Sequence, residues 1–184
     1  MTPSRRKMLA HNTKPPSLQH AATLSLGSNL GDRFAALTNA CQAVTASNVA
    51  KVLAISPIYE TEPIDPPPAC PQLDYLNCII IIITQLTAPQ LLEFLQSIEI
   101  KMGRLPTSQP NMPRCIDIDI ITFDDLQITL PTLTLPHPRA RKRRFVLEPL
   151  ADLRPDFIFP GDNRPIHAIL SELPLLPRVV RYHQ

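Results

Sequence analysis

The sequence lacks several features that mark common classes of protein. No apolar run approaches the about 20 residues that a membrane-spanning helix needs, and the run Ile79–Ile83 is typical of a buried strand. The formal net charge of +2 is too small to indicate nucleic acid as the default partner. The four cysteines show no C-x-x-C spacing and no nearby histidine, which favours reduced thiols in the cytoplasm. Only four glycines stand against 22 prolines, most of which fall in expected loops.

Length and composition predict one soluble domain with a short arm before it. A chain of 184 residues, 44% hydrophobic and 18% charged, is typical of a single globular domain with a sizeable core. Residues 1–20 contain four Lys and Arg residues, three prolines and no acidic residue, so we expect a disordered basic arm there. The same composition also fits a transit peptide. The folded domain is expected to cover residues 21–184.

Hydrophobic periodicity predicts alternating strands and helices. The expected strands are Ala22–Leu26, Val52–Tyr59, Asp74–Gln85 and the segment around Asp117, and the expected helices run from Asp32 to about Ala46 and from Thr87 to about Met102. This β-α-β-β-α-β order is that of a ferredoxin-like α+β fold, with two helices packed on one face of the sheet. In the C-terminal extension we expect a short strand pair near 126–130, a basic turn and a short helix around 166–173.

Asp117 and Asp119 are the most informative residues of the chain. They alternate with isoleucines, and a strand sends alternate residues to opposite faces, so both carboxylates are expected on one face, about 7 Å apart. Two carboxylates this close repel each other unless a positive charge lies between them. Mg²⁺ bound to a polyphosphate meets that demand, because Mg²⁺ usually takes one or two carboxylates and completes its shell with phosphate oxygens and water. The alternative is an exposed edge strand with an acidic face.

Basic residues flank this strand on both sides. Arg104 and Arg114 precede it, and arginine presents a planar fork that binds phosphate through two hydrogen bonds. The run Arg141–Arg144 follows it and is interpreted as a phosphate-binding wall, although a solvated turn or a localisation patch has the same composition. His137, between two prolines, is interpreted either as a buried structural histidine or as a donor to phosphate.

A further group combines aromatic rings with hydrogen-bonding side chains: Thr61, Tyr75, Asn77 and Phe145. A flat, amide-rich heterocycle requires both, because rings stack on its faces and paired donors and acceptors satisfy its edge. Core packing of Tyr75 and Phe145 is the alternative. These residue types therefore favour a heterocyclic ligand beside the phosphate site.

Six motifs lie in order along roughly residues 21–172. They are Ser25-Leu26-Gly27-Ser28-Asn29-Leu30-Gly31-Asp32, Ser56-Pro57-Ile58-Tyr59-Glu60-Thr61, Asp74-Tyr75-Leu76-Asn77, Ile98-Glu99 with Gly103-Arg104, Pro113-Arg114-Cys115-Ile116-Asp117-Ile118-Asp119, and Pro136-His137-Pro138-Arg139 with Arg143 and Phe145. Together they resemble the hydroxymethyl-dihydropterin pyrophosphokinase family. The resemblance implies transfer of a pyrophosphoryl group from ATP to the hydroxymethyl group of 6-hydroxymethyl-7,8-dihydropterin, giving AMP and the pterin diphosphate in folate biosynthesis.

The resemblance also implies roles for individual residues. Asp117 and Asp119 would bind two Mg²⁺ ions that bridge the ATP phosphates, and Arg104 and Arg114 would contact those phosphates during catalysis. The ATP site would comprise Gln96, Glu99, Arg114, Ile120, Thr134, His137 and Arg143. The pterin would lie between Tyr75 and Phe145, with its edge bonded by Thr61, Asn77 and the backbone of Ile64. The partners would be these two small molecules, with no nucleic acid or membrane, and a monomer is expected.

The chain departs from the family pattern in the loop 105–112. The family carries further basic residues and a Trp-Gly pair there, whereas this chain has no tryptophan and has prolines at 106 and 110. Because lids of this type exclude water and complete the site, the differences bear on the rate more than on the fold. A non-catalytic homologue that binds nucleotide or pterin is one alternative. An RRM-like nucleic-acid-binding module is another, but its central strands would carry aromatic residues, and here they are aliphatic and acidic.

Overall fold

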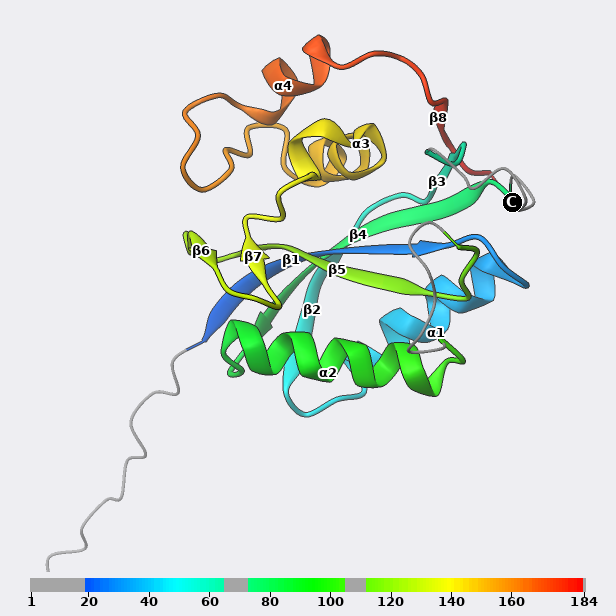
Figure 1. The fold of residues 1–184 in the computed structure, drawn as a ribbon, viewed down its shortest axis with the longest axis vertical. Coiled ribbons are helices and arrows are strands. Elements are labelled where there is room, and N and C mark those ends of the chain that lie inside the picture. The colour runs from blue at the N-terminus through cyan, green and yellow to red at the C-terminus, as the bar shows by residue number, and fades with distance from the viewer. Residues whose placement is uncertain (1–18, 65–72, 105–111, 184) are drawn as a thin grey trace, which may run out of the picture.

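An antiparallel sheet of six strands lies at the centre of the fold (Figure 1). The computed structural model describes residues 19–64, 73–104 and 112–183. The strands follow the order β5-β1-β4-β3-β8, and β2 also pairs with β4. Their bounds are β1 His20–Ser28, β2 Ala50–Ile55, β3 Tyr59–Thr61, β4 Tyr75–Thr84, β5 Asp117–Phe123 and β8 Val179–Arg181. A separate two-stranded ribbon consists of β6 (Ile128–Thr129) and β7 (Thr134–Leu135).

Helices cover both faces of this sheet, so the core has two parts. α1 (Arg33–Thr45) and α2 (Ala88–Lys101) pack on one face, whereas α3 (Arg144–Leu153) and α4 (Ile166–Glu172) lie over the other (Figure 1). A short 3-10 helix, η1 (Ala140–Lys142), precedes α3. Ile79 of β4 and Ile121 of β5 are fully buried on the α3 side. Over much of its length β4 is therefore buried on both faces, as its isoleucine run predicts.

The starts of the first two helices follow from their sequences. The Asp32 carboxylate accepts a hydrogen bond from the Ala35 N–H (2.9 Å), which satisfies one of the free donors of α1. At α2 the Thr87 N–H donates to the Gln90 side chain (2.9 Å), and Pro89 lies in the first turn. Both predicted helices are confirmed, with ends that differ by about a residue.

The predicted β-α-β-β-α-β order is confirmed, but one predicted strand is wrong in its extent and two elements were not predicted. The predicted strand Val52–Tyr59 is interrupted, because Pro57 has no N–H to donate to a strand ladder. The expected basic turn leads directly into a helix, α3, that the sequence pattern did not predict; its basic start and internal Pro149 both weaken the helical signal. The strand β8 was also not predicted.

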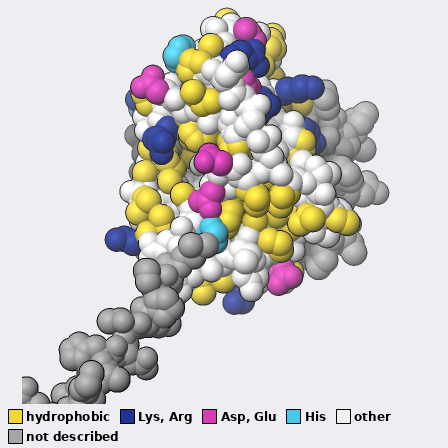
Figure 2. Space-filling model, turned by 90° about the vertical axis from the view of Figure 1, so that its left-hand side faces the viewer, with side chains coloured by type: hydrophobic (Ala, Val, Ile, Leu, Met, Phe, Trp, Pro, Cys, Tyr) yellow, Lys and Arg dark blue, Asp and Glu magenta, His cyan; other side chains and the backbone are white. Residues whose placement is uncertain are grey.

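Three segments lie outside the described residues: most of the expected basic arm (1–18), a segment with four prolines (65–72) and most of the altered loop (105–111). In the described ranges, no helix combines the length and apolarity that a membrane crossing requires. On the face shown in Figure 2, the Lys and Arg side chains are spread around the edge of the view and do not gather at its centre.

Candidate active site

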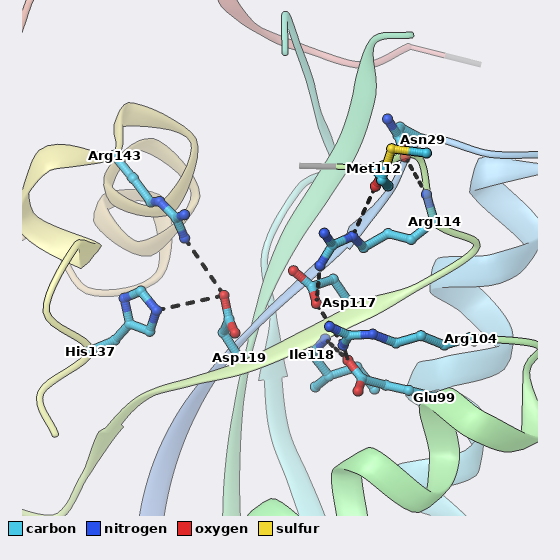
Figure 3. A network of polar contacts seen from close by, with 10 residues as sticks. All are labelled: Asn29, Glu99, Arg104, Met112, Arg114, Asp117, Ile118, Asp119, His137 and Arg143. Atoms are coloured by element: carbon cyan, nitrogen blue, oxygen red, sulfur yellow. Dashed lines mark hydrogen bonds and ion pairs between the residues drawn. The ribbon is translucent and has the colours of Figure 1, made fainter. Parts of the chain in front are cut away.

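The two aspartates of β5 face the same side of the sheet. Ile118 and Ile120 are 4% and 3% exposed, in the core on the α1 and α2 side, whereas Asp117 and Asp119 lie on the opposite face (Figure 3). In the sheet register, Asp117 lies opposite Gly27 of β1. The predicted separation of an acidic row from an apolar row is therefore confirmed, and the acidic row lies on the side covered by α3.

Asp117 is held by two arginines that come from different elements. Arg104 follows the end of α2, and its Nη1 lies 2.8 Å from Asp117 Oδ1. Arg114 precedes β5, and its Nη1 donates to the same oxygen at 3.0 Å. Both guanidinium groups therefore lean over the start of the acidic strand, which they precede in the sequence (Figure 3).

Glu99 connects α2 to β5 beneath these arginines. Its carboxylate is almost fully buried and accepts hydrogen bonds from the Ile118 N–H (2.7 Å) and from Arg104. Burial raises the pKa of Glu99, while the bond from Ile118 opposes that shift. Because Glu99 and Asp117 share Arg104, Glu99 fixes the direction of that guanidinium group.

The negative charge of Asp119 has more distant cationic partners than that of Asp117. Arg143 Nη1 lies 3.6 Å and His137 Nε2 lies 3.8 Å from Asp119 Oδ2, both longer than a hydrogen bond. Burial and then repulsion from Asp117 raise the pKa of Asp119 to about 6. Burial, followed by the charges of Arg143 and Arg139, lowers the pKa of His137 to about 4, so its imidazole is neutral at pH 7. The Asp119 carboxylate therefore gains from an additional positive charge.

A divalent cation of the Mg²⁺ type fits this donor set. In the ranges 19–64, 73–104 and 112–183, no cluster of three or more His, Cys, Asp and Glu residues could enclose a metal ion. The pair Asp117 and Asp119 offers oxygen ligands only, and Mg²⁺ is commonly bound by one or two carboxylates together with substrate phosphates. A closed site of the zinc type would instead need about four protein ligands.

The arginines of the run Arg141–Arg144, after β7, have two different kinds of partner. Arg143 points toward Asp119. Arg141 instead donates to the Pro160 carbonyl oxygen (3.0 Å), and Arg144 donates to the carbonyl oxygens of Leu170 and Leu173 (3.2 and 3.1 Å). The interpretation of the run Arg141–Arg144 as a phosphate-binding wall is therefore wrong for Arg141 and Arg144, which hold the C-terminal extension in place.

Three of the residues predicted for a heterocycle, Thr61, Tyr75 and Asn77, lie at the start of β4 or opposite it on β3, and the fourth, Phe145, lies on α3. The Asn77 side chain donates to Thr61 Oγ1 (2.7 Å), and both residues are buried. Tyr75, half-buried, precedes Asn77 by two residues and so shares its face of β4. On α3, the ring of Phe145 lies 5.3 Å from the Arg143 guanidinium carbon, in a cation–π contact. Polar and aromatic groups therefore adjoin the acidic row.

The remaining predicted site residues differ in how far their side chains are exposed. Gln96 is exposed on α2, and Thr134 is half-buried on β7. The side chain of Ile120 is buried on the far side of the sheet from the carboxylates, so that only its backbone is open to a ligand on their side. Ile64 is exposed at the last described position before the gap at 65–72.

Two residues that sequence reasoning left without a role also shape the site. Asn29 Oδ1 accepts a hydrogen bond from the Arg114 N–H (2.8 Å), and the Asn29 N–H donates to the Arg114 carbonyl oxygen (3.2 Å), which fixes the backbone of this arginine. A Cβ atom on Gly27 would lie 2.8 Å from Asn77 Oδ1, so glycine leaves room for the Asn77 amide. The only sequence signal for both was the motif Gly27-Ser28-Asn29 directly after the predicted first strand, and in the structure β1 continues through Ser28.

The comparison with protein families and the comparison with curated proteins agree with each other. Residues 23–155 match the family described as 7,8-dihydro-6-hydroxymethylpterin-pyrophosphokinase (HPPK). The 2-amino-4-hydroxy-6-hydroxymethyldihydropteridine pyrophosphokinase of Methylorubrum extorquens is 39% identical over 143 residues, which are 77% of this chain and 87% of the relative. The folic acid synthesis protein fol1 of Schizosaccharomyces pombe is 39% identical over 156 residues, but the match covers only 20% of that longer protein.

Solved structures agree in fold. A crystal structure of HPPK-DHPS in complex with substrates matches with a TM-score of 0.67 at 14% identity, covering 83% of this chain and 43% of that one. A Plasmodium falciparum HPPK-DHPS crystallised with pterin and p-hydroxybenzoate matches with a TM-score of 0.66 over 86% of this chain and 44% of that one. Because the family model matches residues 23–155 and the Methylorubrum extorquens pyrophosphokinase is 39% identical over 87% of its own length, this chain belongs to the 7,8-dihydro-6-hydroxymethylpterin-pyrophosphokinase family.

Proposed function

We propose that the chain transfers the pyrophosphoryl group of ATP to the hydroxymethyl group of 6-hydroxymethyl-7,8-dihydropterin, giving AMP and the pterin diphosphate, a step of folate biosynthesis. Membership of the family supports this reaction. The single observation in the structure that carries it is the pair Asp117 and Asp119, on one face of β5 and flanked by arginines on both sides. That arrangement suits a polyphosphate with bound cations.

Asp117 and Asp119 would hold two Mg²⁺ ions, which when bound neutralise the phosphates and orient the transferring group. Phosphoryl-type transfer depends mainly on alignment and on neutralising charge, so no activated side-chain nucleophile is required. The pterin hydroxyl oxygen bonds to the β-phosphorus, the bond from that phosphorus to the oxygen shared with the α-phosphorus breaks, and the hydroxyl proton is released. Asp117 would orient the attacking hydroxyl.

The basic residues around the two aspartates would hold ATP in the position that this transfer requires. Arg104 and Arg114 would release part of their contact with Asp117 and bond the phosphates, and Arg143 and His137 would approach them from the α3 side. Because His137 Nδ1 accepts from the Arg139 N–H (3.2 Å), a neutral His137 carries its proton on Nε2 and would donate one hydrogen bond to a phosphate, whereas Arg143 supplies the charge. Gln96, Glu99, Thr134 and the backbone of Ile120 would line the rest of the nucleotide site.

The pterin would lie on the β3 and β4 side of the phosphates. Tyr75 and Phe145 would stack on its two faces, and Thr61, Asn77 and the Ile64 backbone would bond its edge. The Asn77–Thr61 hydrogen bond supports this placement, because it already orients the amide. Selectivity for the pterin would follow from buried polar groups that a ligand without matching donors leaves unpaired.

We further propose that residues 21–184 act as one monomeric domain in the cytoplasm, with ATP and the reduced pterin as partners. The continuous sheet from β1 to β8 supports a single folding unit. Light scattering coupled to gel filtration tests the monomer, which predicts a mass near 20.6 kDa.

The reaction is tested by incubating the protein with ATP, Mg²⁺ and hydroxymethyl-dihydropterin and following nucleotides by chromatography. AMP that forms only with the pterin present supports the proposal. Asp119→Ala is expected to abolish turnover without unfolding the protein, and Asp156→Ala, at an exposed position after α3, is the matched control. ADP in place of AMP would contradict the proposed chemistry, and Mg²⁺-dependent activity in Asp119→Ala would contradict the metal ligands.

A further inference from the structure

We propose that the C-terminal strand β8 positions the pterin side of the site, through a cluster formed by Tyr59, Asp152 and Arg181. This inference rests on the proposed function, since it assumes that Thr61, Asn77 and Phe145 bind the pterin. The matched family region ends at residue 155, so β8 lies outside it. Tyr59, Asp152 and Arg181 are positioning residues, and none of them is placed in contact with substrate.

The strand β8 stabilises the short strand β3. β3 is only three residues long, and it pairs with β4 on one side and with β8 on the other. Thr61 lies opposite Val179 in this register. Hydrogen bonds continue beyond both ends of the ladder: the Glu62 N–H donates to the Arg178 carbonyl oxygen (3.1 Å), and the Tyr182 N–H donates to the Ile58 carbonyl oxygen (2.8 Å). Without β8, β3 would be a short edge strand.

Side chains then join this strand pair to α3. The Tyr59 hydroxyl donates to Asp152 Oδ2 (2.7 Å), and Arg181 Nη2 donates to Asp152 Oδ1 (2.8 Å). Arg181 Nε also donates to the Tyr59 oxygen (3.3 Å), so the three groups close a ring. Tyr59 is 6% exposed, so its bond to Asp152 is partly buried, whereas the bond from Arg181, whose side chain is 54% exposed, lies at the surface. The cluster fixes the distance between β3 and the end of α3.

Both elements in this contact carry proposed pterin residues. On β3, Thr61 lies two residues after Tyr59 and therefore on the same face, and Tyr59 itself lies opposite Asn77. On α3, Phe145 precedes Asp152 by seven residues, which is about two turns, so both project from the same side of the helix. The spacing between the Phe145 ring and the Thr61–Asn77 pair is therefore set by the Tyr59–Asp152–Arg181 cluster.

The ATP side has separate supports. Asp117 and Asp119 lie on β5, which two strands, β1 and β4, separate from β3. Arg104 is held by Glu99, and Arg114 by Asn29. Arg143, at the start of α3, lies next to an element that the cluster holds. Loosening the cluster is therefore expected to reduce the fraction of molecules with a formed pterin pocket while leaving Asp117, Asp119, Arg104 and Arg114 in place. If that fraction falls to about a tenth, the apparent affinity for pterin falls about tenfold.

The test measures KM for each substrate in Tyr59→Phe, Arg181→Ala and the double variant, all in the full chain. We expect each single change to raise the KM for pterin about tenfold and to leave the KM for ATP within about twofold. Because the residues act as one unit, the double variant is expected to add little to either single change. Arg181→Lys, which keeps the charge and one donor nitrogen, is expected to recover part of the loss. Thermal unfolding verifies that each variant is folded.

Arg164→Ala is the matched control, because this arginine is about as exposed as Arg181 (48% against 54%) and also pairs with carboxylates, but lies near α4. It is expected to leave both KM values unchanged. Unchanged pterin KM in folded Tyr59→Phe and Arg181→Ala, or equal rises in both KM values, would overturn the inference. A wild-type protein that forms no AMP with pterin would instead overturn the proposed function, and that result is visible before any variant is compared.

Discussion

Asp119→Asn is expected to stabilise the metal-free protein while it abolishes turnover. At pH 8 the wild-type carboxylate is ionised, although burial and Asp117 disfavour that form and raise its pKa to about 6. The nearest cationic groups, Arg143 and His137, lie 3.6 and 3.8 Å away and compensate it only in part. An asparagine keeps the shape of the side chain and removes the charge. Activity and stability therefore make opposite demands on this position.

The magnitude follows from the pKa difference between the folded and unfolded states. An unfolded aspartate has a pKa of about 3.9, and each pKa unit is worth about 1.4 kcal/mol, which sets an upper bound of about 3 kcal/mol. The Asp119 side chain is 36% exposed, so solvent screening reduces the expected gain to about 1 kcal/mol. For a chain of this length, that gain corresponds to about 2–4 °C in Tm.

The pH dependence has a definite sign. Because the folded-state pKa of Asp119 is raised, the folded protein binds more protons than the unfolded chain between about pH 4 and pH 6. The cost of the ionised carboxylate is full above about pH 6 and absent below about pH 4, so the advantage of Asp119→Asn is expected to fall to about half at pH 5.

Thermal unfolding in EDTA at pH 8 and pH 5, followed by circular dichroism, measures this effect. Asp156→Asn, which removes an exposed charge, is the control and is expected to change Tm little. A Tm of Asp119→Asn at or below that of the wild type at pH 8, or a gain that does not shrink at pH 5, would refute the reasoning.

Three further predictions concern neighbouring groups. Gly27→Ala is expected to raise the KM for pterin more than the KM for ATP, because its Cβ would lie 2.8 Å from Asn77 Oδ1; equal changes in steady-state kinetics would argue against it. Glu99→Ala is expected to cost about 2–4 kcal/mol in urea unfolding, because it leaves the buried Ile118 N–H unpaired and removes one of the two carboxylates that contact Arg104; a loss below about 1 kcal/mol would contradict this role. The His137 ring is expected to titrate near pH 4 in proton NMR, and a midpoint above pH 6 would show that its surroundings are less buried and less cationic than described.

The acidic row was predictable because strand alternation is local. Asp117 and Asp119 share a face whatever the rest of the chain does, and the isoleucines between them identify the buried side. The helices α1 and α2 were predictable in the same way, from their N-cap residues Asp32 and Thr87. For these parts, the information lies within a few residues of the feature it determines.

Other parts depend on contacts between distant segments. The bonds between Asn29 and Arg114 join residues 85 positions apart, and nothing in either local sequence indicates the partner. The basic run could not be divided from sequence alone, because the start of α3 decides that Arg143 faces the site while Arg141 turns away. The pterin and ATP roles of individual residues stay predictions until ligands are tested.

Phosphorus NMR of the complete reaction tests the central claim most directly. Wild-type protein with ATP, Mg²⁺ and hydroxymethyl-dihydropterin is expected to give the single resonance of AMP together with two coupled resonances from a pterin diphosphate. Asp119→Ala is expected to leave the ATP signals unchanged. Resonances of ADP with a pterin monophosphate, or of ADP with free phosphate, would contradict attack at the β-phosphorus and with it the function proposed for this site.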